Sequence, residues 1–253
     1  MRTIFLPKGK MNIFLECAFF KDFLEKKVGI KRFLENFREF ESSFKAEGIT
    51  ETDVKILKIL LKILKLRNRY FVMRHGESKA NEQGIILSNP REGVPNFGLS
   101  DKGKTQTEES ALKNKRLIKN VIIYSSDFAR ARETAEIVKR MSRAKDEVHF
   151  TMLLRERHFG NWERTANNNY RNVWLDDEID PYHKKESVES VMEVLGRAVS
   201  LIVELEVKYN GKNILLVSHG DTLQILQTWF MRVPPSKHRH LPHLNLAEIR
   251  ELK

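Results

Sequence analysis

Short apolar runs alternate with longer amphipathic stretches through residues 67–253, and this alternation restricts the fold more than any other feature of the sequence. Runs of this length suit buried strands, and the stretches between them suit helices on both faces of a sheet. The sequence therefore predicts an α/β fold, a three-layer α/β/α sandwich with a mostly parallel sheet. The expected strands are Tyr70–Met73, Val121–Tyr124, Val148–Leu153 and Ile214–Val217, with an edge strand at Leu246–Leu252, and the expected helices are 101–116, 128–141, 186–209 and 221–231.

Residues 1–66 have a different character from the rest of the chain. They contain nine of the fifteen phenylalanines and three of the twelve glycines, and apolar residues recur at helical spacing. We expect a helical N-terminal extension, followed by one α/β domain over residues 67–253. The last helix expected in the extension, residues 54–66, carries one stripe of lysines. The stripe favours a helix face exposed to solvent over the alternative of docking to a membrane or a partner. The stripe consists of Lys55, Lys58, Lys62 and Lys65.

The charge of the chain favours anionic partners. Forty-five Lys and Arg against 34 Asp and Glu give a net charge of +11. The excess is +5 in residues 1–66 and +6 in the remainder, and no nucleic-acid-binding motif accompanies it. Small phosphorylated molecules or acidic lipid are therefore expected as partners rather than nucleic acid. Cys17 is the only cysteine and no apolar run is long enough to span a bilayer, so a cytoplasmic location is expected.

Two of the expected strands end in the same way. The first runs into Arg74-His75-Gly76 and the fourth into Ser218-His219-Gly220. Ligands of parallel sheets bind beyond the carboxyl ends of the strands, and the N–H groups of the helix that follows can bind phosphate. Glycine after each histidine permits close approach of the backbone to an anion. The pattern predicts two imidazoles around one bound anion.

Two further strand ends complete a recognisable set. The second strand leads into Ser125-Ser126-Asp-Phe-Ala-Arg130-Ala, and the third into Leu154-Arg-Glu156-Arg-His-Phe-Gly160. Together with Arg74-His-Gly-Glu-Ser78 and Ser218-His-Gly220, in this order and each after a strand, they resemble the histidine phosphatase superfamily, which has the phosphoglycerate-mutase-like fold. The resemblance covers about residues 67–253 and implies the three-layer sandwich already expected.

The resemblance implies a role for each residue of the set. His75 would be the nucleophile that becomes phosphohistidine, and Glu156 the proton donor and acceptor. The phosphoryl group would be held by the side chains or backbone of Arg74, Asn81, Arg130, His219 and Gly220.

The chemistry of these residue types supports the same roles. Phosphoryl transfer needs an in-line nucleophile and cations on the equatorial oxygens, and arginines keep their charge at any working pH. A neutral imidazole is a competent nucleophile near pH 7, and a carboxylic acid of raised pKa can protonate the leaving oxygen. Because the protein supplies the positive charge, we expect neither a metal nor another cofactor.

The interval between Glu156 and His219 distinguishes the branches of the family. The mutases carry a long insertion there, with extra arginines for a carboxylate, whereas this chain has 63 residues and no Arg-Arg pair, and Phe159 stands where the mutases carry tyrosine. We therefore expect a phosphatase, with phosphoglycerate mutase activity and a non-catalytic phospho-ligand or protein-binding module as alternatives. The interval holds, among other basic residues, Arg157, Arg164, Arg171, Lys184, Lys185 and Arg197.

Several other residues near the motifs have two interpretations. Three aromatic residues are candidates for the walls of the substrate pocket or for core packing: Trp162, Tyr170 and Trp174. The histidine cluster around Pro242 lacks the cysteines or carboxylates typical of a metal site, so loop histidines are expected. Its members are His238, His240 and His243. Arg132 and Arg157 lie next to the motifs without an assigned role.

Overall fold

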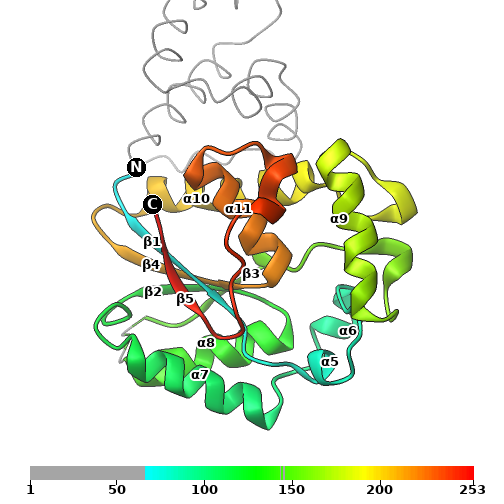
Figure 1. Ribbon diagram of the computed structural model, residues 1–253. Helices are drawn as coiled ribbons and strands as arrows, with labels where there is room; N and C mark the ends of the chain where they lie inside the picture. The colour runs from blue at the N-terminus through cyan, green and yellow to red at the C-terminus, as the bar shows by residue number, and fades with distance from the viewer. Residues whose placement is uncertain (1–65, 143, 145) are drawn as a thin grey trace, which may run out of the picture.

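The computed structural model describes residues 66–142, 144 and 146–253 (Figure 1). The predicted helical extension, with its lysine-striped helix, lies outside the described residues apart from Leu66. Within the described part, five strands form one sheet in the order β3-β2-β4-β1-β5. The first four are parallel, and β5 runs antiparallel to β1 at the edge. The α/β class, the mostly parallel sheet and the edge strand are thereby confirmed.

The elements follow one another along the chain in α/β alternation. The strands are β1 (Arg69–Arg74), β2 (Ile122–Ser126), β3 (His149–Thr151), β4 (Asn213–Ser218) and β5 (Ile249–Leu252). The helices are α5 (Lys79–Glu82), α6 (Pro90–Gly93), α7 (Asp101–Lys113), α8 (Ala129–Ser142), α9 (Tyr170–Ile179), α10 (Val191–Lys208) and α11 (Gly220–Met231). None of these helices has both the length and the apolar character that crossing a membrane requires.

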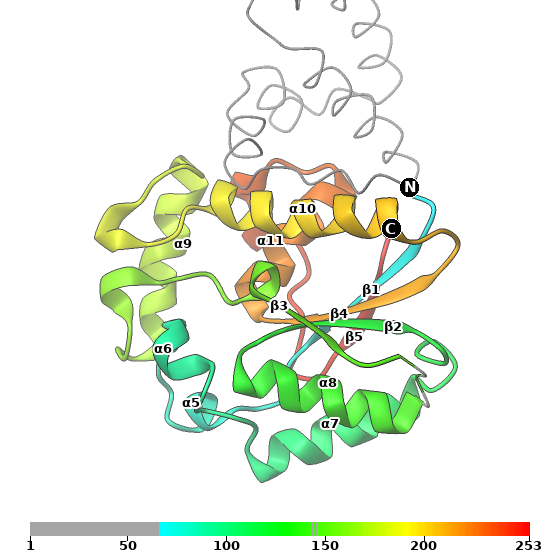
Figure 2. The same ribbon diagram turned by 180° about the vertical axis from the view of Figure 1, so that it is seen from behind.

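The sheet is covered on both faces. Helices α7 and α8 lie together on one face, and α10 and α11 on the other (Figures 1 and 2). Successive residues of a strand point to opposite faces. On β1, Tyr70 and Val72 therefore belong to the core under α10 and α11, whereas Phe71 and Met73 belong to the core over α7 and α8. This double burial explains why the central strands read as continuous apolar runs.

Several elements differ from the sequence prediction, including the edge strand, which begins at Ile249 instead of Leu246, and the short helices α5 and α6, which were not predicted. The third strand ends at Thr151, where a short 3-10 turn begins, instead of continuing to Leu153. Helix α10 begins at Val191 rather than near 186, because Ser190 and Glu193 form a capping box. Helix α9 was not predicted: its buried residues are Val173 and the charged Asp177, so it lacks an apolar stripe. Figure 2 shows α9 beside α6, at the end of the sheet where the site lies.

Candidate active site

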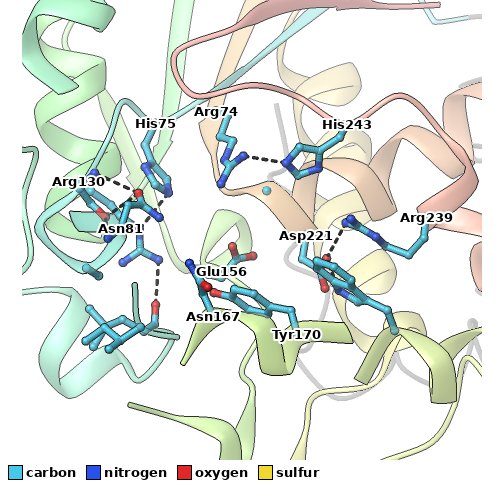
Figure 3. A pocket seen from close by; sticks show the side chains of 16 residues that line it. Arg74, His75, Asn81, Arg130, Glu156, Asn167, Tyr170, Asp221, Arg239 and His243 are labelled. Atoms are coloured by element: carbon cyan, nitrogen blue, oxygen red, sulfur yellow. Dashed lines mark hydrogen bonds and ion pairs between the residues drawn. The ribbon is translucent and has the colours of Figure 1, made fainter. Parts of the chain in front are cut away.

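A cavity of about 260 Å³ opens beyond the carboxyl ends of β1 and β4 (Figure 3). It is lined by residues at or after the ends of all four parallel strands and by residues of helices α5, α9 and α11. Those named by the sequence prediction are Arg74, His75, Asn81, Arg130, Glu156, Tyr170, Trp174 and Gly220. The structure therefore brings these predicted residues together although they lie up to 146 positions apart in the chain, from Arg74 to Gly220.

The ring of His75 is held in one tautomer. Its Nδ1 lies 2.7 Å from the carbonyl oxygen of Gly76, which can only accept, so Nδ1 carries the proton. Nε2 is then unprotonated, and Nε of Arg130 donates to it over 3.1 Å. Burial, followed by the charges of Arg130 and Arg74, lowers the pKa of His75 well below its usual value. His75 is thus a neutral imidazole with its lone pair on Nε2, where it accepts from Arg130.

Arg130 lies at the centre of the cluster. Its Nε also donates to Nδ1 of His219 over 3.1 Å, and Nη2 donates to the carbonyl of Leu87 over 3.0 Å. His219 in turn contacts Oγ of Ser126 through Nε2 at 2.9 Å, and its ring packs edge-on against His75. His219 is fully buried and does not line the cavity, so it supports Arg130 and His75 from behind.

Arg74 is held from the C-terminal loop. Its Nη1 donates to Nε2 of His243 over 2.7 Å and to the carbonyl of Leu244 over 3.0 Å. The other ring nitrogen of His243 lies 3.3 Å from Oε1 of Gln224, and burial together with the charge of Arg74 lowers the pKa of His243 to about 4. The sequence interpretation of His243 as a loop histidine missed this contact, because no local motif marks it.

Two arginine nitrogens are buried with no protein partner among the described residues: Nη1 of Arg130 and Nε of Arg74. Arg130 is 4% exposed. A buried charged donor without an acceptor is costly, because it has lost the hydrogen bonds of water. Both side chains line the same cavity beside His75 (Figure 3). The arrangement fits an anion with several acceptor oxygens.

Glu156 is a carboxyl group in a setting that favours its proton. Its Oε1 accepts from the backbone N–H groups of Arg157 and Thr222, at 2.9 and 3.3 Å. Burial raises the pKa of Glu156, and the nearby charge of Asp221 raises it further, against a smaller opposing effect of Arg130. Asp221 itself stays ionised: burial opposes its ionisation, but His238, Arg157 and Arg239 hold its pKa below the usual value.

Arg157, which had no assigned role, ties helix α9 to the site. Its side chain is fully buried and donates to both carboxylate oxygens of Asp177, at 2.6 and 2.7 Å. It also reaches Asp221 at 3.3 Å. Nε2 of His183 lies 2.7 Å from the same Asp177. This buried network had no sequence signal, because Asp177 and His183 look like ordinary surface residues in the sequence.

Two of the three candidate wall residues line the cavity. The rings of Tyr170 and Trp174 are stacked, 5.5 Å apart and nearly parallel at 7°. Trp162 packs instead against the separate cluster around Phe159. On Trp174, the guanidinium of Arg239 lies 3.5 Å from the ring centroid, which adds a wall residue the sequence did not indicate.

Asn81 and the two glycines that follow the histidines have different places in the site. Asn81 lines the cavity, and its Oδ1 accepts from the N–H and hydroxyl of Ser78, which begins α5. A side chain on Gly76 would collide with the carbonyl oxygen of Gly103 in α7, at 2.4 Å, so this glycine serves helix packing rather than approach to an anion. Gly220 lines the cavity at the start of α11, as expected.

Comparison with known proteins agrees with this geometry. Residues 70–253 match the family model of the histidine phosphatase superfamily (branch 1). The chain is 28% identical over 178 residues to a probable phosphoglycerate mutase of Escherichia coli, covering 68% of this chain and 78% of the relative. It is 27% identical over 182 residues to phosphoglycerate mutase-like protein 4 of Arabidopsis thaliana, covering 70% and 75%.

Solved structures give the same fold. The mycobacterial glucosyl-3-phosphoglycerate phosphatase superposes with a TM-score of 0.61 at 24% identity, covering 72% of this chain and 91% of that one. A phosphoserine phosphatase variant of Entamoeba histolytica, solved with phosphoserine, superposes with a TM-score of 0.59 at 25% identity, covering 73% and 89%. The confirmed resemblance thus extends over the whole described domain.

Proposed function

The chain belongs to the histidine phosphatase superfamily, and we propose that it hydrolyses small phosphomonoesters through a phosphohistidine on Nε2 of His75. The observation that carries the proposal is the pair of unpartnered, buried arginine nitrogens beside that unprotonated Nε2. A phosphoryl group offers acceptors to Arg74 and Arg130 and a phosphorus atom to the imidazole. The site thereby contains a nucleophile and the cations for its target.

The first step transfers the phosphoryl group. Nε2 of His75 attacks phosphorus in line, the bond to the ester oxygen breaks, and Glu156 gives its proton to that oxygen. Arg74 and Arg130 neutralise the equatorial oxygens throughout. In the second step, water attacks the phosphohistidine, its proton passes to Glu156, and phosphate leaves. His75 and the protonated acid are restored, so the cycle needs no metal.

Mutase activity is the second candidate, favoured by the names of the curated relatives. A mutase would pass the phosphoryl group from the same His75 to a second hydroxyl instead of water. We favour hydrolysis because, among the described residues, no Lys or Arg of the interval between Glu156 and His219 lines the cavity. None of them is therefore placed to hold a phosphoglycerate carboxylate there. A non-catalytic binding module would have no use for a buried Glu156 of raised pKa in the same cavity as a neutral His75.

The test is phosphate release from an aryl phosphate and a panel of alkyl phosphates, with EDTA present. His75→Ala should lower turnover by more than ~10³-fold, since no other group is placed to accept the phosphoryl group. The control is His240→Ala, an exposed histidine that pairs with Glu178 and should leave activity unchanged. Rapid quench of the wild-type protein should yield acid-labile, base-stable phosphate. A His75→Ala protein with more than a tenth of wild-type activity would refute the assignment.

The organisation of the whole chain remains part of this proposal. We place residues 1–66 in a helical extension separate from the catalytic domain of residues 67–253, supported by the positions of the motifs, all from Arg74 onward. A cytoplasmic location is supported by Cys17 being the only cysteine. A chain beginning at Leu66 should then keep its turnover number within several-fold, whereas a folded but inactive shortened protein would contradict the division.

A further inference from the structure

The charged groups around the cavity form two sets that differ in how fully they are paired. Among the described residues, the cations that line it are Arg74, Arg130 and Arg239, and the carboxyl groups are Glu156 and Asp221. Arg74 and Arg130 keep buried nitrogens without partners. Arg239 and Asp221 are paired with each other and with further groups. The end of the cavity at Arg74, His75 and Arg130, the phosphate end, thus carries surplus positive charge (Figure 3). The opposite end at Asp221 and Arg239, the far end, carries no surplus.

At the far end, two arginines face two aspartates. Arg157 binds both oxygens of Asp177, at 2.6 and 2.7 Å, and these two charges cancel. Asp221 contacts Arg157 at 3.3 Å, Arg239 at 3.5 Å and Nε1 of Trp174 at 3.0 Å. Arg239 also donates to Oε1 of Gln224 and has one face on Trp174. Its charge is therefore matched by Asp221, which lies in the cavity wall.

The basic residues of the interval before His219 add no charge to this wall. Four of them form ion pairs outside the cavity, and Arg171 is exposed and does not line it. The four pairs are Arg164 with Glu92, Lys184 with Glu193, Lys185 with Asp176, and Arg197 with Glu189. Among the described residues, a second anion on the substrate would find no unpaired cation at the far end, and it would lie near the carboxylate of Asp221.

The remaining wall residues are uncharged. Tyr170 and Trp174 present stacked rings, and Asn167 and Tyr170 offer hydrogen-bonding groups. The cavity, at about 260 Å³, is smaller than the usual pocket for a drug-sized ligand, which starts at about 300 Å³. The two unpaired arginines neutralise one phosphoryl dianion, provided that Glu156 keeps its proton. In the part of the chain that the structure describes, nothing at the far end compensates a further negative charge.

Resting on the proposed function, we infer that the substrate is a small phosphomonoester whose leaving group is an uncharged, hydroxyl-bearing molecule. The hydroxyl groups would bind to the polar side chains of the far wall, and carbon-bound hydrogens would pack on the rings. The specificity comes from Asp221, which forms an ion pair with Arg239 and repels a carboxylate of the substrate. Specificity of this kind uses repulsion as well as attraction.

Glycerol 3-phosphate and 3-phosphoglycerate form a matched pair of probes, because a hydroxymethyl group in one replaces a carboxylate in the other. Each is tested as a competitive inhibitor of aryl phosphate hydrolysis by the full chain, so that a constant is obtained whether or not the probe is itself hydrolysed. We expect glycerol 3-phosphate to bind at least tenfold more tightly. Equal binding, or tighter binding of 3-phosphoglycerate, overturns the inference while leaving the phosphatase assignment intact.

Two variants test whether Asp221 is the cause. Asp221→Asn frees the charge of Arg239 and should shift the ratio of the two inhibition constants at least fivefold toward 3-phosphoglycerate, whereas Arg239→Gln should shift it the other way. Effects on catalysis that both probes share cancel in this ratio. An unchanged ratio in folded variants contradicts the discrimination by Asp221. If the aryl phosphate is not hydrolysed at all, the proposed function fails. Dissociation constants of the two probes from calorimetry then test the charge discrimination separately.

Discussion

The buried pair of Arg157 and Asp177 predicts how strongly helix α9 is fixed to the domain. Both side chains are fully buried, and Asp177 accepts hydrogen bonds from two guanidinium nitrogens at 2.6 and 2.7 Å. Nε2 of His183 contacts it at 2.7 Å. Asp177→Asn keeps the shape of the side chain but removes the charge and one acceptor oxygen. Arg157 then keeps its bond to the carbonyl oxygen of Glu189, at 2.7 Å, but its one remaining carboxylate contact is the longer one with Asp221, at 3.3 Å.

The expected loss follows from leaving a buried guanidinium without its main counter-charge. Breaking a buried ion pair by removing one partner costs about 3–5 kcal/mol, a large share of the roughly 5–15 kcal/mol that stabilises a typical domain. For a domain of this size, a loss of about 3 kcal/mol corresponds to a fall in Tm of roughly 6–12 °C. The wall residue Trp174 lies on the same helix, so the substrate pocket should loosen as well.

Urea unfolding measures the change, with the m value checked for constancy. The matched control is Asp176→Asn, one residue earlier on α9, where the carboxylate pairs with the exposed Lys185. Surface pairs of this kind contribute about 0–1 kcal/mol, so this variant should resemble the wild type. If Asp177→Asn destabilises the protein no more than Asp176→Asn does, the network does not hold α9, and the argument from burial is wrong.

Two further predictions concern Glu156. Glu156→Gln should slow hydrolysis of alkyl phosphates by about 10²-fold or more but affect an activated aryl phosphate much less, because a phenolate leaves without a proton; equal losses in a comparison of kcat/KM would indicate a structural role. The pKa of Glu156 is raised in the folded protein, so the folded state holds this proton more tightly than the unfolded chain does. The stability that this proton contributes is therefore present at low pH and is lost as the pH rises through the raised pKa. The urea midpoint of the wild type should therefore fall relative to that of Glu156→Gln as pH increases, and parallel curves would contradict the assigned environment.

The sequence predicted the elements that obey one simple periodicity. The strands β1, β2 and β4 are buried on both faces and appear as apolar runs. Helix α8 follows with a buried stripe, and α11 with a continuous buried run from Gly220 to Thr228. Helix α9 could not be predicted in this way, because the side chain that fixes it is the charged Asp177. Its partner, Arg157, lies 20 residues earlier, and no local pattern connects the two.

The residues of the candidate site also fall into a group that the sequence predicts and a group that it does not. Arg74, His75, Arg130 and Glu156 could be predicted because each follows a strand within a motif, and parallel strands bring their carboxyl ends together. Residues that hold these groups or form the far wall come from α9 and the C-terminal loop. His243, which binds Arg74, and Arg239, which covers Trp174, have no spacing that relates them to the motifs. Only the folded chain places them.

Asp221 connects the chemistry of the site to its selectivity. Its charge helps to raise the pKa of Glu156, and the same carboxylate contacts Arg157, Arg239 and Trp174. An ionised group in this position therefore favours the protonated acid that the leaving oxygen requires and disfavours a second anion on the leaving group. The two effects have one electrostatic origin. A substitution that removes the charge of Asp221 must change the pH dependence of hydrolysis and the discrimination between charged and uncharged leaving groups together.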